Sequence, residues 1–411
     1  MHSFRVFVLL VALLATVVLA RPAPSKTTKT LQPRSFKVPR SLNPKVKRKD
    51  GARAIRKAMR KYGIKPVTAA SNQTLAAGNS TGENGEVAAN PEDNEALFLS
   101  PVKIGGQTLN LDFDSGSSDL WVFSTQLSQQ TIGGHTAYNS ANSSTFEQMQ
   151  GASFLITYGD GSGAAGNVGL DTVDIGGATV TKQAIEMATA VSQSFVEDTN
   201  TDGLVGLAFS KINTVKPQQQ KTFFDNIMAD LDQPVFTADL TNDTTGTYEF
   251  GTIDQTKFKG ALTYTAVNTT QGFWQFQSKS FAIDGQKVDN PTGNDAIADT
   301  GTSLLLVDDN VAQQYYSKVQ GAVNDPNAGG FTYPCDAKLP DMAVAIGDNY
   351  MAVIPGDQVT FAAVDQTNTT CFGGVQGNQG SSLQIYGDTM FKAQFVVFDG
   401  GNQSLGMAPK N

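Results

Sequence analysis

Short runs of apolar residues, many of them alternating with polar ones, recur through the chain from residue 97 onward. Gly, Asn and Asp separate these runs, which lie at residues 98–104, 108–113, 154–158, 168–175 and 248–251. Runs of this kind are typical of β-strands. Helical patterns in this part are few, and the clearest cover residues 222–231 and 308–319. We therefore expect a mainly β protein, because a doubly wound parallel sheet needs long helices between its strands.

The first 20 residues form a separate segment. Arg5 is followed by an apolar run that ends at the small residue Ala20. A basic start, an apolar centre and a small-residue end are typical of a signal peptide, and the run is too short and too terminal for a membrane-spanning helix. The sequence therefore predicts a secreted, extracellular protein that has no membrane segment once residues 1–20 are removed.

Charge divides the remaining chain into two parts. Residues 21–70 contain 16 Lys or Arg and one acid, whereas residues 71–411 contain 13 Lys, no Arg and 37 acids. A basic arm on an acidic body is compatible with nucleic-acid binding, but the upstream signal peptide favours a propeptide that covers an acidic enzyme. The charges of the acidic part repel one another at neutral pH, and protonation of carboxylates relieves this repulsion. We therefore expect the processed enzyme to be more heat-stable near pH 4 than near pH 7.

The basic segment has its own local patterns. Residues 21–50 are rich in Pro and are expected to be extended, whereas residues 51–61 predict a short helix with Ile55, Ala58 and Met59 on one face.

Residues 71–94 follow and are rich in Asn, Gly, Ser and Ala. They have almost no large apolar residues and are expected to be a flexible junction. The end of the propeptide is therefore open between residues 68 and 94.

Two segments of the acidic part match each other. Phe-Asp-Ser-Gly-Ser-Ser precedes an apolar run at residues 113–122, and Ala-Asp-Thr-Gly-Thr-Ser does so at residues 298–307, 185 residues later. One Asp-Ser/Thr-Gly would indicate no more than a turn, but two copies with matched flanks predict two related lobes that each present a carboxylate. Held close together, Asp114 and Asp299 could not both ionise easily and would share a proton.

With these motifs the chain resembles the pepsin-like aspartic proteases (peptidase family A1), and within them the fungal aspergillopepsin and penicillopepsin group. The resemblance covers residues 97–409. It implies an all-β, bilobal fold with an N-terminal lobe at residues 97–280, a C-terminal lobe at residues 281–408, a cleft between them and a β-hairpin flap. It also implies that Asp114 and Asp299 activate one water molecule as general base and general acid.

The resemblance assigns supporting roles to further hydroxyl groups and segments. Ser115 and Thr300 would brace the two loops, and Ser117 and Thr302 would bind the outer carboxylate oxygens. Two apolar-apolar-Gly segments would back the loops, at residues 204–206 and 385–387, which begin 90 and 86 residues after the aspartates. Tyr386 in the second segment and Ser115 in place of Thr are minor departures from the family pattern.

The segment Tyr158-Gly159-Asp160-Gly161-Ser162 resembles the flap that closes over substrate, although an ordinary hairpin has the same composition. In the resemblance the hydroxyl of Tyr158 bonds to the indole of Trp121. Asp160, helped by Ser162, would allow Lys before the cleaved bond, and hydrophobic residues are expected on both sides of it. We expect Trp121 to line the apolar cleft together with Phe195 and Leu204.

Lys61 and Tyr62 resemble the Lys-Tyr pair with which related propeptides enter the cleft. Placed between the carboxylates, Lys61 would neutralise them, depress their pKa values and block substrate. A solvated basic face is the alternative. The precursor is therefore expected to be inactive near neutral pH and to shorten itself in acid.

Cysteine and histidine usage favours a disulfide and excludes several catalytic mechanisms. Cys335 and Cys371 favour a disulfide in an oxidising compartment over two buried free thiols. Only one histidine follows residue 20, so Ser-His-Asp, Cys-His and His-Glu-x-x-His chemistries lack parts, and this residue, His135, is expected in a solvated loop. We expect no metal, no cofactor, no nucleic-acid partner and a monomer. Seven Asn-x-Ser/Thr sites fit a glycoprotein: Asn72, Asn79, Asn142, Asn242, Asn268, Asn368 and Asn402.

The leading hypothesis is a secreted acid endopeptidase, made as a zymogen, that acts on polypeptides and is blocked by its own propeptide and by pepstatin-type inhibitors. A catalytically inactive pepsin-like binding protein is the first alternative, although such proteins usually have a broken Asp-Ser/Thr-Gly motif or lack the flap tyrosine. A glycosidase with paired acids is the second, and it would not need duplicated hydroxyl-flanked loops.

Overall fold

The computed structural model describes residues 35–42, 51–62, 98–158, 162–199, 201–241, 246–364 and 367–411. The predicted signal peptide and junction, the flap residues Gly159, Asp160 and Gly161, and three of the predicted glycosylation sites (Asn72, Asn79 and Asn242) lie outside these residues. Within the described part, no helix combines the length and the apolar character that crossing a membrane requires.

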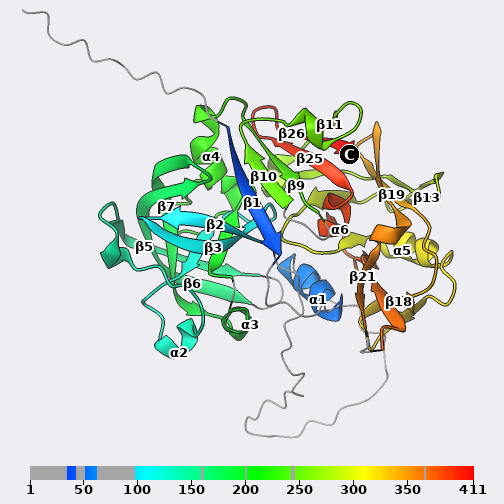
Figure 1. Ribbon diagram of the computed structural model, residues 1–411, viewed down its shortest axis with the longest axis horizontal. Coiled ribbons are helices and arrows are strands. Elements are labelled where there is room, and N and C mark those ends of the chain that lie inside the picture. Colours follow the sequence, from blue (N-terminus) through cyan, green and yellow to red (C-terminus); the bar gives the residue numbers. More distant parts are fainter. Residues whose placement is uncertain are drawn as a thin grey trace, which may run out of the picture. The chain divides into compact units, whose positions relative to one another are not determined.

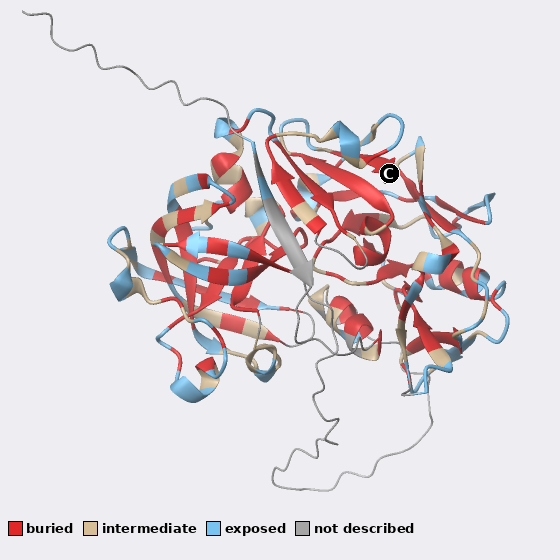
Figure 2. Cartoon of the chain, in the orientation of Figure 1, coloured by how far each residue is buried: buried red, intermediate tan, exposed pale blue. Residues whose placement is uncertain are grey.

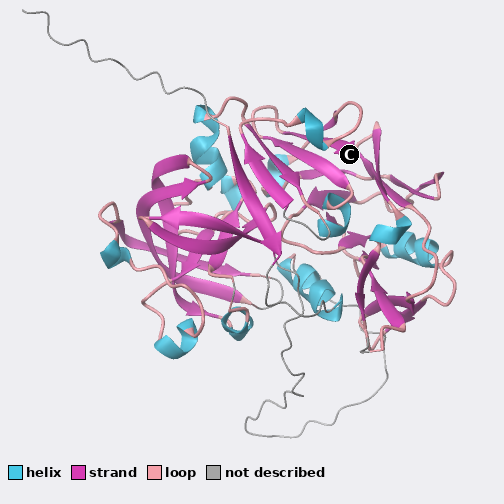
Figure 3. Ribbon diagram, in the orientation of Figure 1, coloured by secondary structure: helices cyan, strands magenta, loops and turns pink. Residues whose placement is uncertain are grey.

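Strands dominate the described residues (Figure 3), which confirms the mainly β prediction. The largest sheet has thirteen strands in the order β11 (Thr263–Ala266), β26 (Ser404–Pro409), β25 (Gln394–Asp399), β9 (Val235–Asp239), β10 (Gly246–Phe250), β1 (Phe36–Leu42), β2 (Phe98–Ile104), β3 (Gln107–Asp114), β8 (Gly203–Gly206), β4 (Leu120–Phe123), β7 (Ala178–Val191), β6 (Gly163–Ile175) and β5 (Glu147–Thr157).

Three smaller sheets belong to the second half of the chain. Their strand orders are β12 (Gln275–Gln277), β15 (Asp295–Ala298), β24 (Gln384–Tyr386), β16 (Leu305–Val307), β23 (Val375–Gly377); β14 (Gln286–Asp289), β13 (Ser280–Ile283), β19 (Met342–Ile346), β20 (Tyr350–Ile354); and β17 (Val323–Asp325), β18 (Gly330–Pro334), β22 (Thr370–Gly373), β21 (Thr360–Ala363).

The helices are short. They are α1 (Gly51–Lys61), α2 (Gln129–Ile132), α3 (Gln193–Glu197), α4 (Phe223–Ile227), α5 (Asp309–Tyr316) and α6 (Asp388–Phe391). The predicted helix at residues 51–61 matches α1. The helices predicted at residues 222–231 and 308–319 are both present but shorter. Thr222 caps α4, which continues as a 3₁₀ turn from Met228. Asp308 directly precedes α5.

One arrangement of four strands occurs twice. In the first half, β3 runs parallel to β8, β8 antiparallel to β4, and β4 parallel to β7. In the second half, β15, β24, β16 and β23 repeat the same order and the same directions. Asp114 ends β3 and Asp299 directly follows β15, so the repeat places the two aspartates at equivalent positions. The sequence repeat is therefore a structural repeat as well.

Strand β1, shown in blue in Figure 1, joins the basic segment to the large sheet. It pairs antiparallel with β10 from Phe36 to Arg40 and with β2 at Ser41 and Leu42. The sequence predicts an extended segment here but not these partners, because a strand's pattern does not specify which edge it will complete.

Helix α1 uses the predicted apolar face. Ile55, Ala58 and Met59 are buried together with Ala54 (Figure 2), and they pack on a cluster that includes Leu306 from β16. Burying Ile55 and Met59 contributes on the order of 2 kcal/mol each. This packing holds the end of the helix, and hence Lys61, over the ends of β3 and β15.

The predicted disulfide is present between Cys335, which follows β18, and Cys371 in β22. The two residues are 36 positions apart in the sequence. Closing a loop of this size stabilises a fold by roughly 3–4 kcal/mol, mainly by restricting the unfolded chain.

Candidate active site

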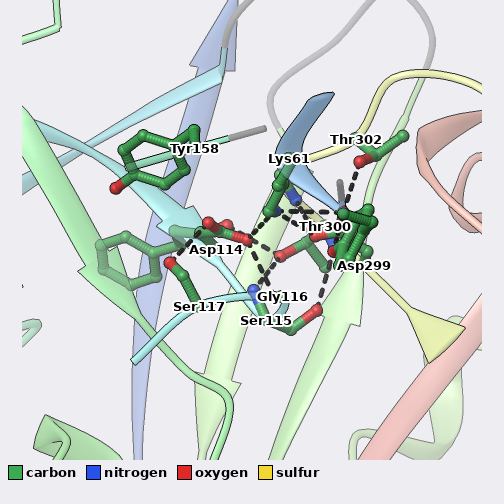
Figure 4. Close-up of polar contacts among 12 residues, drawn as sticks. Lys61, Asp114, Ser115, Gly116, Ser117, Tyr158, Asp299, Thr300 and Thr302 are labelled. Atoms are coloured by element: carbon green, nitrogen blue, oxygen red, sulfur yellow. Dashed lines mark hydrogen bonds and ion pairs between the residues drawn. The ribbon is translucent and has the colours of Figure 1, made fainter. Parts of the chain in front are cut away.

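The carboxylates of Asp114 and Asp299 face each other across the ammonium group of Lys61 (Figure 4). Lys61 Nζ lies 2.6 Å from Asp114 Oδ1 and 2.9 Å from Asp299 Oδ1. Both aspartates are buried, with exposed fractions of 1% and 0%. The prediction that two remote aspartates meet therefore agrees with the geometry.

Each carboxylate is held by the loop that carries it, in the same way in both halves. Oδ1 accepts from the backbone amide two residues later, Gly116 at 2.8 Å for Asp114 and Gly301 at 3.0 Å for Asp299. Oδ2 accepts from the hydroxyl three residues later, which is Ser117 for Asp114 and Thr302 for Asp299. These bonds fix both side chains before any substrate arrives.

Glycine is required in both loops because each passes close to the opposite carboxylate. A Cβ atom on Gly301 would lie 2.5 Å from Asp114 Oδ1, and one on Gly116 would lie 2.6 Å from Asp299 Oδ1. Any other residue at these positions would therefore push the pair apart.

Ser115 and Thr300 connect the two loops behind the carboxylates. The Ser115 hydroxyl accepts from Thr300 N at 2.9 Å and donates to the carbonyl of Ala298. The Thr300 hydroxyl accepts from Ser115 N at 3.1 Å and donates to the carbonyl of Phe113 at 2.7 Å. All four groups are buried, so the brace is shielded from water and Ser115 serves as well as a threonine would.

Tyr62, which follows Lys61 in the predicted propeptide, also contacts the carboxylate pair. Its hydroxyl donates to Asp299 Oδ2 at 2.6 Å. Burial lowers the pKa of Lys61, but the two carboxylates outweigh it and raise that pKa above its ordinary value. Burial raises the pKa of the Tyr62 hydroxyl, and the neighbouring carboxylates raise it further. Both groups therefore stay protonated as donors.

The pKa values of the two aspartates are shifted in opposite directions. Burial raises the pKa of Asp299, but Lys61 and the hydrogen bonds from Thr302 and Tyr62 outweigh it and hold that pKa below its ordinary value. For Asp114, burial and the charge of Asp299 outweigh the attraction of Lys61, so the pKa is raised. The expectation that both carboxylates beside Lys61 have depressed pKa values is therefore wrong for Asp114, although Lys61 itself lowers the pKa of each aspartate.

Comparison with known proteins agrees with this geometry. The model of the family "Eukaryotic aspartyl protease" matches residues 98–410. The chain belongs to the eukaryotic aspartyl protease family. Its class is therefore the predicted one, an aspartic-type endopeptidase, and its substrates are polypeptides.

Individual relatives cover most of the protease. It is 48% identical to an aspergillopepsin A-like aspartic endopeptidase of Aspergillus fumigatus, over 99% of both chains. It is 51% identical to penicillopepsin-1 of Penicillium rubens over 79% of this chain and 81% of the relative. It is 46% identical to the aspartic protease PEP3 of Coccidioides posadasii over 96% and 93%.

Tyr158 and Ser162, the described residues of the predicted flap, directly follow β5 and precede β6, which pair antiparallel. The Trp121 indole donates to the Tyr158 hydroxyl at 2.9 Å, and Tyr158 N donates to the carbonyl of Ser162 at 2.8 Å across the hairpin end. The ring of Phe195 packs on both aromatic side chains, with centroids 4.8 Å from Trp121 and 5.7 Å from Tyr158.

A cavity of about 40 Å³ lies beside Asp114 and under the hairpin. Its lining includes Tyr158, Phe195 and Leu204 of the protease, together with Lys57 and Lys61 of α1. The sequence predicted Trp121, Phe195 and Leu204 here, but Trp121 is fully buried and is not part of the lining. The sequence missed Lys57, although the spacing of four residues from Lys61 placed both on the same face of the predicted helix.

The sequence suggested that His135 lies in a solvated loop, but the structure shows that its side chain is buried. Its exposed fraction is 7%, and its ring stacks on Phe123 with centroids 3.7 Å apart. Its two ring nitrogens lie 3.0 Å from the carbonyl of Thr201 and 3.3 Å from that of Val196. These contacts replace water and tie the loop before β5 to the segment after α3.

Proposed function

We propose that the chain is a secreted acid endopeptidase, made as an inactive precursor, that hydrolyses peptide bonds with Asp114 and Asp299 as the catalytic pair. One observation carries the proposal: Lys61 Nζ binds both buried carboxylates at hydrogen-bonding distance. A polar group at that point can reach both carboxylates, as a reacting water molecule must. Each carboxylate also keeps two bonds from its own loop, which would hold it in place after Lys61 leaves.

In the processed enzyme the two aspartates share one proton, because two buried carboxylates this close cannot both ionise easily. The ionised member takes a proton from the water as that water attacks the scissile carbonyl. The protonated member gives its proton to the carbonyl oxygen, which yields a neutral tetrahedral diol. The diol collapses as the aspartate that took the water proton passes it to the leaving nitrogen and a diol hydroxyl returns its proton to the other aspartate. Which aspartate carries the proton is a property of the pair.

The roles of the surrounding residues follow from this mechanism. Ser115 and Thr300 keep the carboxylates at a constant separation, and Ser117 and Thr302 orient the outer oxygens. Tyr158 and the hairpin that carries it exclude all but the reacting water. The apolar cleft favours hydrophobic residues on both sides of the bond, with Lys accepted before it through Asp160 and Ser162.

The propeptide supplies the inhibitor in the precursor. Lys61 and Tyr62 occupy the carboxylates, α1 covers the cleft, and β1 completes the large sheet. We propose that residues 1–20 direct secretion, that the processed enzyme acts as a monomer, and that pepstatin-type compounds inhibit it by occupying the same carboxylates.

The test is digestion of acid-denatured haemoglobin by the acid-treated protein, with and without a pepstatin-type inhibitor. We expect peptide release in acid, inhibition by the compound, and loss of at least about 10³-fold in kcat for Asp299→Asn, since half of the acid-base pair is removed. An intact fold with no peptide release would favour the inactive binding protein instead.

A further inference from the structure

A second pair of acids is buried close to Asp114. Asp119 directly precedes β4, and Glu186 lies in β7, where it is the parallel partner of Trp121. Each has an exposed fraction of 1%. The ion pairs between described residues include neither of them. Two acids in a sheet interior without a cation require another source of stabilisation.

Hydrogen bonds satisfy only one oxygen of each carboxyl group. Asp119 Oδ1 accepts from Thr214 N at 2.9 Å, from Thr214 Oγ1 at 2.8 Å and from Asn213 Nδ2 at 3.3 Å. Glu186 Oε1 accepts from Asn213 Nδ2 at 2.9 Å. Within the described residues, Asp119 Oδ2 and Glu186 Oε2 meet no N–H or hydroxyl donor.

The two carboxyl groups nevertheless lie side by side, because the same amide group, Asn213 Nδ2, is 3.3 Å from Asp119 Oδ1 and 2.9 Å from Glu186 Oε1. A hydrogen bond between two carboxyl groups needs a proton, since two carboxylates are both acceptors. One proton on the pair would satisfy both remaining oxygens at once, as an O–H of Glu186 that donates to Asp119 Oδ2. Asp119 is the ionised member because three donors stabilise its charge, whereas Glu186 has one.

The electrostatic surroundings favour the same assignment. Burial raises the pKa of Glu186 well above its ordinary value, and the charge of Asp119 raises it further. Burial also raises the pKa of Asp119, and the charge of Asp114 raises it further. Tyr158 is the other titratable group near the pair, and it feels the charges of both acids. Loss of the shared proton would therefore leave two like charges buried side by side.

The pair is connected to the loop that carries Asp114. The carbonyl of Asp119 accepts from Gly206 N at 2.9 Å, and Asn213 Nδ2 also donates to the carbonyl of Ser118 at 3.2 Å. The next amide along from Gly206, that of Leu207, donates to the carbonyl of Asp114 at 2.7 Å. Asp119 and Asp114 lie at the two ends of one short loop, and two consecutive amides at the end of β8 hold both.

We propose that the proton shared by Asp119 and Glu186 positions the Asp114 loop and sets the upper pH limit at which the protease keeps its active structure. This inference rests on the proposed catalytic role of Asp114. Glu186 is a positioning residue, since it acts on the catalytic carboxylate only through Asp119 and its loop.

The direction of the pH effect on stability follows from the pKa of Glu186 in the folded and the unfolded protein. A glutamic acid has an ordinary pKa of about 4.3, and that of Glu186 is raised in the folded protein. The stabilisation from the shared proton is therefore complete below about pH 4.3 and is lost as the pH rises through the folded value. The loop should loosen on the neutral side of that value, whereas acid should leave the pair intact.

The test compares the full-length parent with Glu186→Gln, whose neutral amide donates to Asp119 at every pH. Tryptophan fluorescence follows thermal unfolding from pH 4 to pH 8, and peptide release is measured after incubation at pH 7 relative to pH 4. We expect Glu186→Gln to lose stability at a pH about one unit higher than the parent and to inactivate about tenfold more slowly at pH 7, since one pKa unit corresponds to a tenfold change in proton binding.

Glu147→Gln is the matched control, because Glu147 is an exposed acid of the same sheet, paired with Lys182. It should behave as the parent. An equal change in stability at every pH for Glu186→Gln, or an unchanged alkaline limit, would overturn the inference and leave a purely structural residue.

Asp119→Asn provides the second variant, because its amide can donate to an ionised Glu186, and it should raise the alkaline limit as well. Failure of both isosteric variants to fold at pH 4 would also overturn the inference, since each keeps the hydrogen bond. The unfolding measurement needs no activity. An active Asp114→Asn protein would sink the proposed function alone, whereas unshifted unfolding curves would sink only the inference on Glu186.

Discussion

The side chains of Ser115 and Thr300 each accept the other's backbone N–H, at 2.9 Å and 3.1 Å, although 185 residues separate them in the chain. Each hydroxyl then donates to the carbonyl that precedes the opposite aspartate. The separation of Asp114 and Asp299 is therefore set by four buried hydrogen bonds between the loops, which are independent of the propeptide and of substrate.

Ser115→Ala should weaken this brace. It leaves the amide of Thr300 and the carbonyl of Ala298 without the serine hydroxyl, at a cost of about 1–3 kcal/mol for each buried group left unpaired. We expect a lower urea midpoint and a lower kcat, while Ser115→Thr keeps both. In a double-mutant cycle Thr300→Ala should add less than its own single effect, because the two hydroxyls act together. Full additivity would show that they act separately.

Asp114→Asn should abolish self-processing. The purified precursor is expected to stay whole near neutral pH and to shorten itself on acidification, which gel electrophoresis and mass spectrometry follow. The variant keeps a hydrogen-bonding side chain at the position but cannot act as a base. Shortening of this variant with no other protease present would contradict an autocatalytic step.

Lys37→Met should make the precursor respond at a higher pH. Lys37 in β1 lies 3.0 Å from Asp254 and 3.5 Å from Glu249. Hydrogen bonds from Thr256, followed by the bond from Lys37, hold the pKa of Asp254 below its ordinary value. Their contribution is therefore complete above about pH 4 and is lost as the pH falls through the folded value.

Removing Lys37 takes part of that contribution away wherever Asp254 is ionised. The midpoint of self-processing should move up by less than about one pH unit, because an exposed ion pair contributes at most about 1 kcal/mol. Lys182→Met, which breaks an exposed pair with Glu147 away from the propeptide, is the control. Equal shifts in both variants would mean that net charge, and not this contact, controls processing.

Asp160→Asn should change specificity more than overall rate. On paired peptides that carry Lys or Leu before the cleaved bond, kcat/KM should fall more than about tenfold for the Lys peptide, because a charged partner is lost, and little for the Leu peptide. The same loss on both peptides would show that Asp160 serves the flap in general and does not recognise Lys.

The amino-acid sequence by itself determined the features that depend on local order. Alternating runs specify strands, the spacing of Ile55, Ala58 and Met59 specifies the inner face of α1, and the matched Asp-Ser/Thr-Gly segments identify the two aspartates. These patterns are local because backbone geometry repeats every two or about 3.6 residues.

Only the tertiary structure decided which distant groups meet. The pairing of β1 with β10, the contacts of His135 with Val196 and Thr201, and the meeting of Asp119 and Glu186 at Asn213 join segments that lie far apart in the chain. A pKa depends on burial and on neighbours in space, so neither motif predicts that the pKa values of Asp114 and Asp299 shift in opposite directions. The sequence signal for Glu186 is its position as an acid within the apolar run of β7.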